Sequence, residues 1–178
     1  MPPKLKTESE RQQLRALIID AARELFVARG VAAVTMREIA KRIGYSATSI
    51  YLHFSDKEAL LRAICDTDFL ALARSLKNVM LIVNPIDRLK ALSNGYAAFA
   101  LTHPNHYRLM FMTERTPCDP EQSSLQQNSA EQDAYYQLKT VVNDLHAAGY
   151  FRADLKDADL IAQTIWAGMH AWRMLITN

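Results

Sequence analysis

Residues 35–61 read TMREIAKRIGYSATSIYLHFSDKEALL, and they predict more of the architecture than any other segment. Thr35 and Glu38 have the spacing of a capping box, in which each side chain binds the other residue's backbone N–H at a helix start. A helix is therefore predicted to begin directly after Thr35. Gly44 can take the left-handed conformation that ends a helix, and Ser46 can cap the next one. Two helices joined by so short a turn are typical of a helix-turn-helix, whose second helix enters the major groove of DNA.

The second of these helices, predicted over residues 47–54, leaves most of its side chains outside. Only Ile50 and Phe54 fall on a face that can be buried. Small residues at its start allow a close approach to base edges, and hydroxyl groups suit phosphate oxygens. These hydroxyl groups belong to Ser46, Thr48, Ser49 and Tyr51. This helix is therefore predicted to contact DNA.

A third helix is predicted to begin at Asp56, because Ser55 and Glu58 again have capping-box spacing. Lys57 lies in its first turn, from which its ammonium group can reach a phosphate. Apolar residues then recur at helical spacing as far as Ile82. This helix is therefore predicted to be long and to tie the N-terminal part to the rest of the chain.

The remaining chain is also predicted to be helical, because apolar residues keep recurring at helical spacing and no segment alternates with the period of a strand. After the helix that ends near Ile82, the predicted helices cover residues 86–103, 105–112, 129–148 and 156–176, and residues 114–128 are predicted to be a loop. The fold class is therefore all-α. An N-terminal three-helix helix-turn-helix head is predicted over residues 1–55, with 1–8 as a mobile arm, and a helical body over 56–178.

The charge is distributed unevenly along the chain. Residues 1–62 carry eleven Lys and Arg against seven Asp and Glu, whereas the whole chain has a net charge of only +2. Cations that neutralise phosphates drive non-specific binding to nucleic acid, so a basic excess on the head agrees with DNA binding. An ordinary solvated surface is the other interpretation of such an excess.

The composition indicates a soluble protein of the cytoplasm. No run approaches the ~18 apolar residues that a membrane span needs, and the N-terminus has no apolar core of the signal-peptide type. Cys65 and Cys118 give neither a disulfide framework nor the spacing of metal ligands, which fits a reducing compartment.

The elements TMREIA, GYS and SIYLHFSDKEALL, preceded by AARELFVARGVAAVT, match one family pattern at fixed spacing. Through them residues 14–62 resemble the N-terminal domain of TetR-type (tetracycline-repressor-like) transcriptional regulators. The resemblance implies a dimeric repressor with a three-helix DNA-binding head and a variable body that serves ligand binding and dimerisation.

The resemblance also implies roles for individual residues of the head. Family positions that hold phosphates are matched by Thr35, Ser49, Tyr51, His53 and Lys57. Family positions that face bases or the groove wall are matched by Arg37, Ala47 and Thr48. An arginine can bind guanine through two hydrogen bonds. For His53, capping of a helix end is the alternative role.

The predicted body concentrates aromatic, sulfur-containing and imidazole side chains. Such side chains suit an apolar ligand pocket with a few polar groups, and they equally suit an ordinary helical core. Buried hydroxyl and imidazole groups need partners, so Tyr96, Tyr107 and His170 are the candidates for polar contacts. The predicted pocket residues are Tyr96, Phe99, Tyr107, Met110, Phe111, Trp166 and His170.

Other classes of function find less support in the sequence. His103 and His106 are three residues apart, but Pro104 separates them and no Cys or carboxylate lies at a supporting interval, so no metal site is predicted. The chain has no glycine-rich phosphate loop and no hydrolase motif, so neither an enzyme nor a cofactor is predicted. The remaining alternative is a helical protein-interaction module with a head that no longer binds DNA.

The predicted function is a ligand-responsive transcriptional regulator, a repressor that a small apolar effector releases from a double-stranded DNA operator. A homodimer is expected, because one head buries little DNA and two heads would reach successive major grooves about 34–36 Å apart. In the family the last two long helices build the dimer interface. This sequence ends on the apolar stretch WAGMHAWRMLITN, where such proteins commonly continue into one more helix. Two interpretations follow, a chain truncated before a final helix or a reduced dimer interface.

Overall fold

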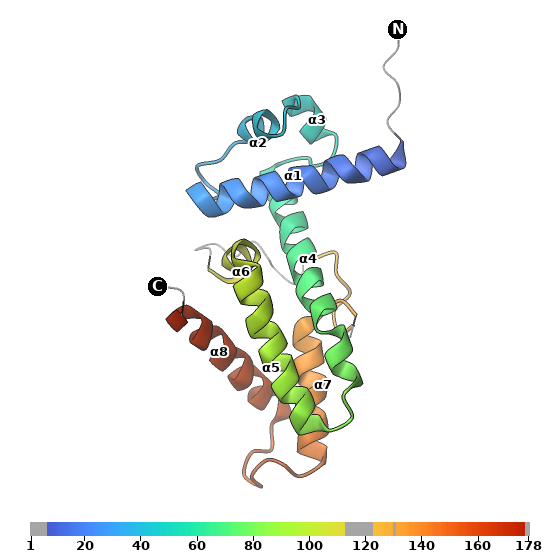
Figure 1. The fold of residues 1–178 in the computed structure, drawn as a ribbon, viewed down its shortest axis with the longest axis vertical. Coiled ribbons are helices and arrows are strands. Elements are labelled where there is room, and N and C mark those ends of the chain that lie inside the picture. Colours follow the sequence, from blue (N-terminus) through green and yellow to red (C-terminus); the bar gives the residue numbers. More distant parts are fainter. Residues whose placement is uncertain (1–6, 113–122, 130, 177–178) are drawn as a thin grey trace. The chain divides into compact units, whose positions relative to one another are not determined.

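The computed structural model describes residues 7–112, 123–129 and 131–176, with side chains as far as Ala171 (Figure 1). Every regular element in these residues is helical, which confirms the all-α prediction. The elements are α1 (Glu8–Arg29), α2 (Met36–Arg42), α3 (Ala47–Tyr51), α4 (Lys57–Ser75), the 3₁₀ helix η1 (Lys77–Leu81), α5 (Pro85–Thr102), α6 (Pro104–Phe111), α7 (Ala134–Ala147) and α8 (Ala158–Ile176). None of the described helices is long and apolar enough to cross a bilayer.

The described residues group into two compact units. The first contains the residues up to Asp66 together with 105–112, and the second contains 67–104, 123–129 and 131–176. Helix α4 runs from the first unit into the second, and α6 belongs with the first.

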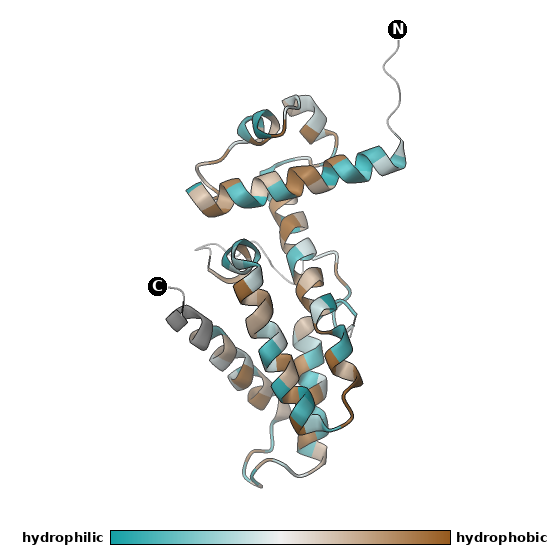
Figure 2. Ribbon diagram, in the orientation of Figure 1, coloured by the Kyte–Doolittle hydropathy of each residue, from teal (hydrophilic) through white to brown (hydrophobic). Residues whose placement is uncertain are grey.

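Helix α1 begins at Glu8 because Thr7 and Glu10 form a capping box. The Thr7 hydroxyl accepts from the Glu10 backbone N–H at 3.2 Å, and Glu10 Oε2 accepts from the Thr7 N–H at 2.7 Å. Figure 2 shows that the first turns of α1 are hydrophilic. The predicted mobile arm over 1–8 is thus too long by at least two residues, and residues 1–6 lie outside the described residues.

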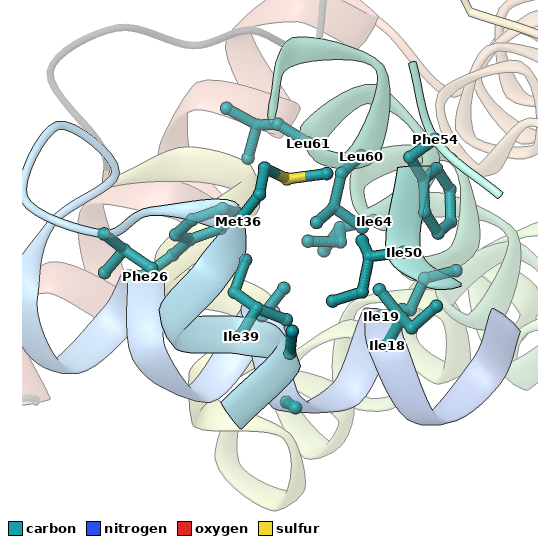
Figure 3. Close-up of a cluster of buried hydrophobic side chains, with 14 of the residues drawn as sticks. Ile18, Ile19, Phe26, Met36, Ile39, Ile50, Phe54, Leu60, Leu61 and Ile64 are labelled. Atoms are coloured by element: carbon teal, nitrogen blue, oxygen red, sulfur yellow. The ribbon is translucent and has the colours of Figure 1, made fainter. Parts of the chain in front are cut away.

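The core of the first unit is one apolar cluster to which α1, α2, α3, α4 and α6 all contribute (Figure 3). Ile50 and Phe54 are both buried in it, as the sequence predicts. Burying a side chain of this size stabilises the fold by about 1.5–3 kcal/mol. The buried members of the cluster include Leu14, Ile18, Ile19, Phe26, Val34, Met36, Ile39, Ile50, Phe54, Leu60, Leu61, Ile64 and Leu109.

The helix-turn-helix begins as the sequence predicts and ends earlier. Thr35 and Glu38 form the expected capping box, Gly44 has a φ of +72°, and the Ser46 hydroxyl accepts from the Ser49 N–H at 3.1 Å. Helix α3 stops at Tyr51, three residues before the predicted end. The reason is a tighter turn, in which the His53 N–H donates to the Ile50 carbonyl at 2.8 Å.

Helix α4 starts one residue later than predicted, because Asp56 and not Ser55 caps it. Asp56 Oδ1 accepts from the Ala59 N–H at 2.6 Å, and the Ser55 hydroxyl donates to Asp56 Oδ2 at 3.0 Å. The helix also ends at Ser75 instead of continuing to residue 82. The Ser75 hydroxyl donates to the Leu72 carbonyl at 2.7 Å, which is a local bond that competes with the helical ladder, and η1 follows.

Cys65 of α4 is buried and disulfide-bonded, so the prediction of no disulfide is wrong for this residue. A single buried apolar position in an amphipathic helix looks the same in the sequence whether its sulfur is a thiol or a disulfide. Cys118 lies outside the described residues.

The second unit packs α7 against both α5 and α8, with the end of α4 alongside α5 (Figure 1). Gly95 of α5 allows this approach, since a Cβ atom there would lie 2.7 Å from Leu76 Cδ2. Buried Gln137 of α7 donates from Nε2 to the Ala73 carbonyl of α4 at 3.0 Å. The other buried side chains include Leu72, Leu92, Tyr96, Phe99, Leu138, Val141, Val142, Leu145 and Ala162.

Three helices of the second unit begin after an Asn or Asp cap. Asn84 accepts from the Ile86 and Asp87 N–H groups, Asp133 accepts from the Tyr136 N–H, and Asp157 accepts from the Leu160 N–H. Helix α7 consequently starts five residues after the predicted position 129, and α8 starts two residues after 156. Periodicity located the helices, whereas the caps fix where they start.

Candidate nucleic-acid interface

Helix α3 presents a hydroxyl-rich surface on the side opposite its buried Ile50. Ser46, Thr48 and Tyr51 are exposed, and Tyr51 shows 52% of its surface to solvent. Ala47 and Ser49 are half-buried between these positions. Because Ile50 anchors the helix in the core, these groups are held in fixed positions. A short helix of this kind can lie in a major groove and donate hydrogen bonds to phosphates and base edges.

The N-terminal end of α3 is fixed by its serine cap. The Ser46 and Ser49 hydroxyl oxygens are 2.9 Å apart, and the same Ser46 oxygen accepts from the Ser49 N–H. The contact between the two hydroxyls uses one O–H donor, so the other O–H of the pair can donate to a phosphate oxygen. The pair therefore combines capping of the helix with a surface that can bind a phosphate.

Arg37 lies in the first turn of α2 with its side chain exposed. Its guanidinium makes no hydrogen bond or ion pair to any residue that the structure describes. Five N–H donors on a rigid planar group are therefore available to a guanine edge or a phosphate.

Thr35, also predicted to hold a phosphate, belongs to a network at the start of α2. Its N–H and hydroxyl both donate to Glu38 Oε2, at 2.8 and 2.9 Å. Arg29 Nη1 donates to Glu38 Oε1 at 2.8 Å. The hydrogen bond from the Thr35 backbone, followed by those from Arg29 and the Thr35 hydroxyl, lowers the pKa of Glu38 to about 2. The first turn of α2 is thus held by a carboxylate that stays ionised well below neutral pH.

Lys57, in the first turn of α4, points toward the loop between α1 and α2. Its Nζ donates to the carbonyl oxygens of Val31 at 2.8 Å, Val34 at 3.1 Å and Ala32 at 3.5 Å. Arg29 Nη2 donates to the remaining carbonyl of this run, that of Ala33, at 3.2 Å. The four consecutive carbonyls of residues 31–34 therefore all accept from cationic side chains.

His53 is half-buried, and its ring lies 6.5 Å from that of Phe54. Phe54 also receives the guanidinium of Arg15 from α1, which stands 5.2 Å from the ring centroid. Sequence reasoning missed Arg15 and Arg29, since neither belongs to a local motif. Only their contacts in the folded head distinguish them from other surface arginines.

The predicted pocket residues fall into two groups. Tyr96, Trp166 and His170 come together in the second unit, where Tyr96 Oη lies 2.6 Å from His170 Nδ1 and the Trp166 ring lies 4.9 Å from the imidazole. Phe99, in the same unit, packs its ring 4.9 Å from that of His103. The other predicted residues, Tyr107, Met110 and Phe111, belong to the first unit.

The Tyr96–His170 pair is a neutral polar contact among aromatic rings. Burial lowers the pKa of His170 to about 4, so its imidazole is uncharged near neutral pH. Tyr135 of α7 adds a ring 5.6 Å from Trp166, and sequence reasoning did not include it. Tyr135 is one of two adjacent tyrosines, and no pattern indicates which of them turns toward α8.

Two family models match this chain. One, described as bacterial regulatory proteins of the tetR family, matches residues 18–64, and the other, described as the tetracyclin repressor-like C-terminal domain, matches residues 89–172. The helix-turn-helix-type transcriptional repressor KstR2 of Mycobacterium tuberculosis is 31% identical over 170 residues, which cover 89% of this chain and 81% of that protein. The transcriptional regulator TtgR of Pseudomonas putida is 42% identical over 62 residues, covering 35% of this chain and 30% of that protein.

Solved structures share the fold. The fatty acid degradation regulator FadR from Bacillus halodurans superposes with a TM-score of 0.73 at 22% identity, covering 93% of this chain and 82% of that one. The regulator FadR from Bacillus subtilis in complex with stearoyl-CoA superposes with a TM-score of 0.69 at 20% identity, covering 86% and 82%.

Proposed function

The chain belongs to the TetR family of ligand-responsive, DNA-binding transcriptional regulators, and we propose that it is a repressor released from its operator by a small apolar effector. This family is one of regulators and not a class of enzymes. The family is described as one of bacterial regulatory proteins, and bacterial chromosomes lie in the cytoplasm, which is the location we propose.

The observation that carries the proposal is the surface of α3, where exposed hydroxyls stand opposite a fully buried Ile50. We assign phosphate contacts to Ser46, Ser49, Tyr51 and His53, and not to Thr35, because its N–H and hydroxyl donors both bind Glu38. We assign contacts with bases or the groove wall to Arg37, Ala47 and Thr48. The uncommitted guanidinium of Arg37 supports its assignment, because a bidentate contact with guanine contributes about 1–3 kcal/mol of discrimination.

We propose that two copies bind one operator. The palindromic sites of helix-turn-helix dimers require two heads about 34–36 Å apart, and a single head has too little surface for tight specific binding. Helix α8 supports dimerisation through its apolar character, since Leu160 is 59% exposed and Ile165 and Met169 are only half-buried. Sedimentation that gave a monomer at micromolar concentration would contradict this proposal.

We propose that the effector binds beside Tyr96, Trp166 and His170. Aromatic rings around one neutral polar pair suit an apolar molecule with a single hydrogen-bonding group. The stearoyl-CoA complex of the Bacillus subtilis regulator makes fatty acyl-CoA the first class to test. Binding there would shift α4, which continues into the first unit. The resulting loss of operator affinity cannot exceed the difference between the effector's affinities for the DNA-free and DNA-bound states.

The test is a mobility shift with the DNA upstream of the protein's own gene, over a series of salt concentrations. Wild type should bind with a steep salt dependence, and Tyr51→Ala should bind weakly while keeping its helical circular dichroism. Stearoyl-CoA should release wild type from this DNA, whereas free coenzyme A is the matched control. Should wild type bind neither this DNA nor any duplex selected from a random pool, the interaction-module alternative takes the place of the regulator.

A further inference from the structure

We infer that Lys57 positions the helix-turn-helix by holding the α1–α2 loop and does not bind a phosphate. The inference rests on the DNA-binding role of the head and assigns a different task to one residue that the family resemblance places on DNA. Lys57 and Arg29 together form what we call the loop clamp. We define it as these two side chains and the carbonyls of residues 31–34 that they bind.

The geometry of the ammonium group carries the inference. Lys57 Nζ has three donors, and three carbonyl oxygens of the loop lie within 2.8–3.5 Å of it. Its side chain is half-buried at this point. A phosphate could be reached only by giving up bonds from a charged donor, which are stronger than bonds between neutral groups. The donors of Lys57 are therefore already committed inside the protein.

The loop depends on these bonds because it makes few of its own. Only the Val34 N–H donates within it, to the Val31 carbonyl at a long 3.4 Å. The three carbonyl oxygens that converge on Lys57 Nζ would repel one another without a cation among them. A compact ammonium with rotatable donors meets three such oxygens better than a planar guanidinium does.

The clamp joins the first turns of two helices. Lys57 opens α4, and Val34, whose carbonyl it binds, precedes Thr35, the cap of α2. Arg29 ties the same loop to α2 by binding both the Ala33 carbonyl and Glu38. A displacement of α4 is therefore transmitted to the start of α2 through main-chain atoms.

The experiment compares Lys57→Met with Lys41→Met in the full-length protein. Lys41 is an exposed lysine of α2 whose ammonium group makes no hydrogen bond or ion pair with the described residues, so its variant loses the same charge without touching the clamp. Amide hydrogen exchange is followed in the loop and the first turn of α2. We expect exchange there to be about tenfold faster in Lys57→Met and unchanged in Lys41→Met.

The second readout is the salt dependence of operator binding. Loss of a phosphate contact lowers the slope of log K against log [salt] by about 0.9 for each contact, whereas loss of the clamp weakens binding and leaves the slope unchanged. A lower slope in Lys57→Met overturns the inference, and so does unchanged exchange in the loop.

Lys57→Arg keeps the test decisive if Lys57→Met does not fold. It retains the charge and can still reach a phosphate, but its planar donors cannot meet the three carbonyls together. Faster exchange in the loop is expected again, and wild-type exchange would refute the clamp. The exchange measurement needs no DNA, so a wild-type protein without operator affinity refutes the proposed function and leaves the clamp to be judged separately.

Discussion

The candidate sites of the first unit and the second unit differ in the polar contacts that hold them. In the first, ionised side chains at the surface hold main-chain atoms, as Lys57 and Arg29 do with the loop carbonyls and Glu38 does at the start of α2. In the second, neutral groups pair inside the fold, as Tyr96 does with His170 and Gln137 with the Ala73 carbonyl.

The difference agrees with the partners that we propose for the two regions. A surface that reads DNA needs a fixed backbone close to a highly charged partner, and ionised contacts to the main chain hold it. A region that admits an apolar molecule cannot keep unpaired charges near it, because desolvating them is costly. Neutral pairs such as Tyr96 with His170 can open toward a ligand at a much smaller cost.

The largest expected effect comes from removing the anchor of α3. Ile50→Ala should lower the free energy of unfolding by about 2–5 kcal/mol, because a fully buried side chain leaves a cavity. Operator binding should be lost at temperatures at which the chain is still folded. Urea unfolding and a mobility shift, measured on the same variant, check this. Leu138→Ala is the matched control, because it leaves a cavity in the second unit, and this variant should still bind the operator.

Lowering the pH from 6.5 toward 4 should reduce the stability of the second unit and not that of the first. Burial lowers the pKa of His170 from 6.5 to about 4. Between these two pH values the unfolded chain therefore binds a proton at His170 and the folded chain does not. The stability that depends on neutral His170 is complete above pH 6.5 and is lost as the pH falls toward 4. Tryptophan fluorescence of thermal unfolding between pH 7 and 4 measures this, and His170→Gln should flatten the dependence. An equally acid-sensitive variant would contradict the assignment.

In the first unit, the contribution of ionised Glu38 to the stability of the first turn of α2 should persist to lower pH. The pKa of Glu38 is lowered from 4.5 to about 2, so its contribution is present above pH 4.5 and is lost as the pH falls toward 2. Hydrogen exchange in the first turn of α2 should therefore stay slow at pH 5, where the second unit is already weakened. Glu38→Gln is the variant to compare, and loss of protection in wild type between pH 7 and 5 would count against this order.

The smallest effect is expected from one hydroxyl on α3. Tyr51→Phe keeps the exposed ring and removes a donor, so operator affinity should fall by a factor that corresponds to about 0.5–1.5 kcal/mol. Folding should be unchanged because the side chain is 52% exposed. Titration of the operator by fluorescence anisotropy resolves such a change, and wild-type affinity would remove Tyr51 from the proposed contact set.

Local patterns predicted the start of α2 and the buried face of α3, because the bonds and spacings that fix them are local. The Thr35–Glu38 box spans three residues, and the burial of Ile50 and Phe54 follows from helical spacing. The end of α3 at Tyr51 could not be predicted in this way, because it depends on how the chain turns to bring Phe54 into the core.

The contacts of the Lys57 side chain could not be predicted from the sequence for a different reason. Its acceptors lie 23 to 26 residues away and are main-chain atoms, which carry no mark in the sequence. The Tyr96–His170 pair spans 74 residues, so both members could be proposed for a pocket but not for each other. The Asp caps of α7 and α8 were visible in the sequence, but the prediction relied on apolar periodicity instead.

The loop clamp has an evolutionary consequence, because it holds oxygen atoms that every residue type possesses. Ala32 and Ala33 expose their side chains, so either can mutate without altering what Lys57 and Arg29 bind. Homologues can therefore diverge freely at these two positions while keeping the same loop path. Selection should instead be strongest on Arg29 and Lys57. These two cations flank a loop in which the side chains of residues 32 and 33 can change with little effect.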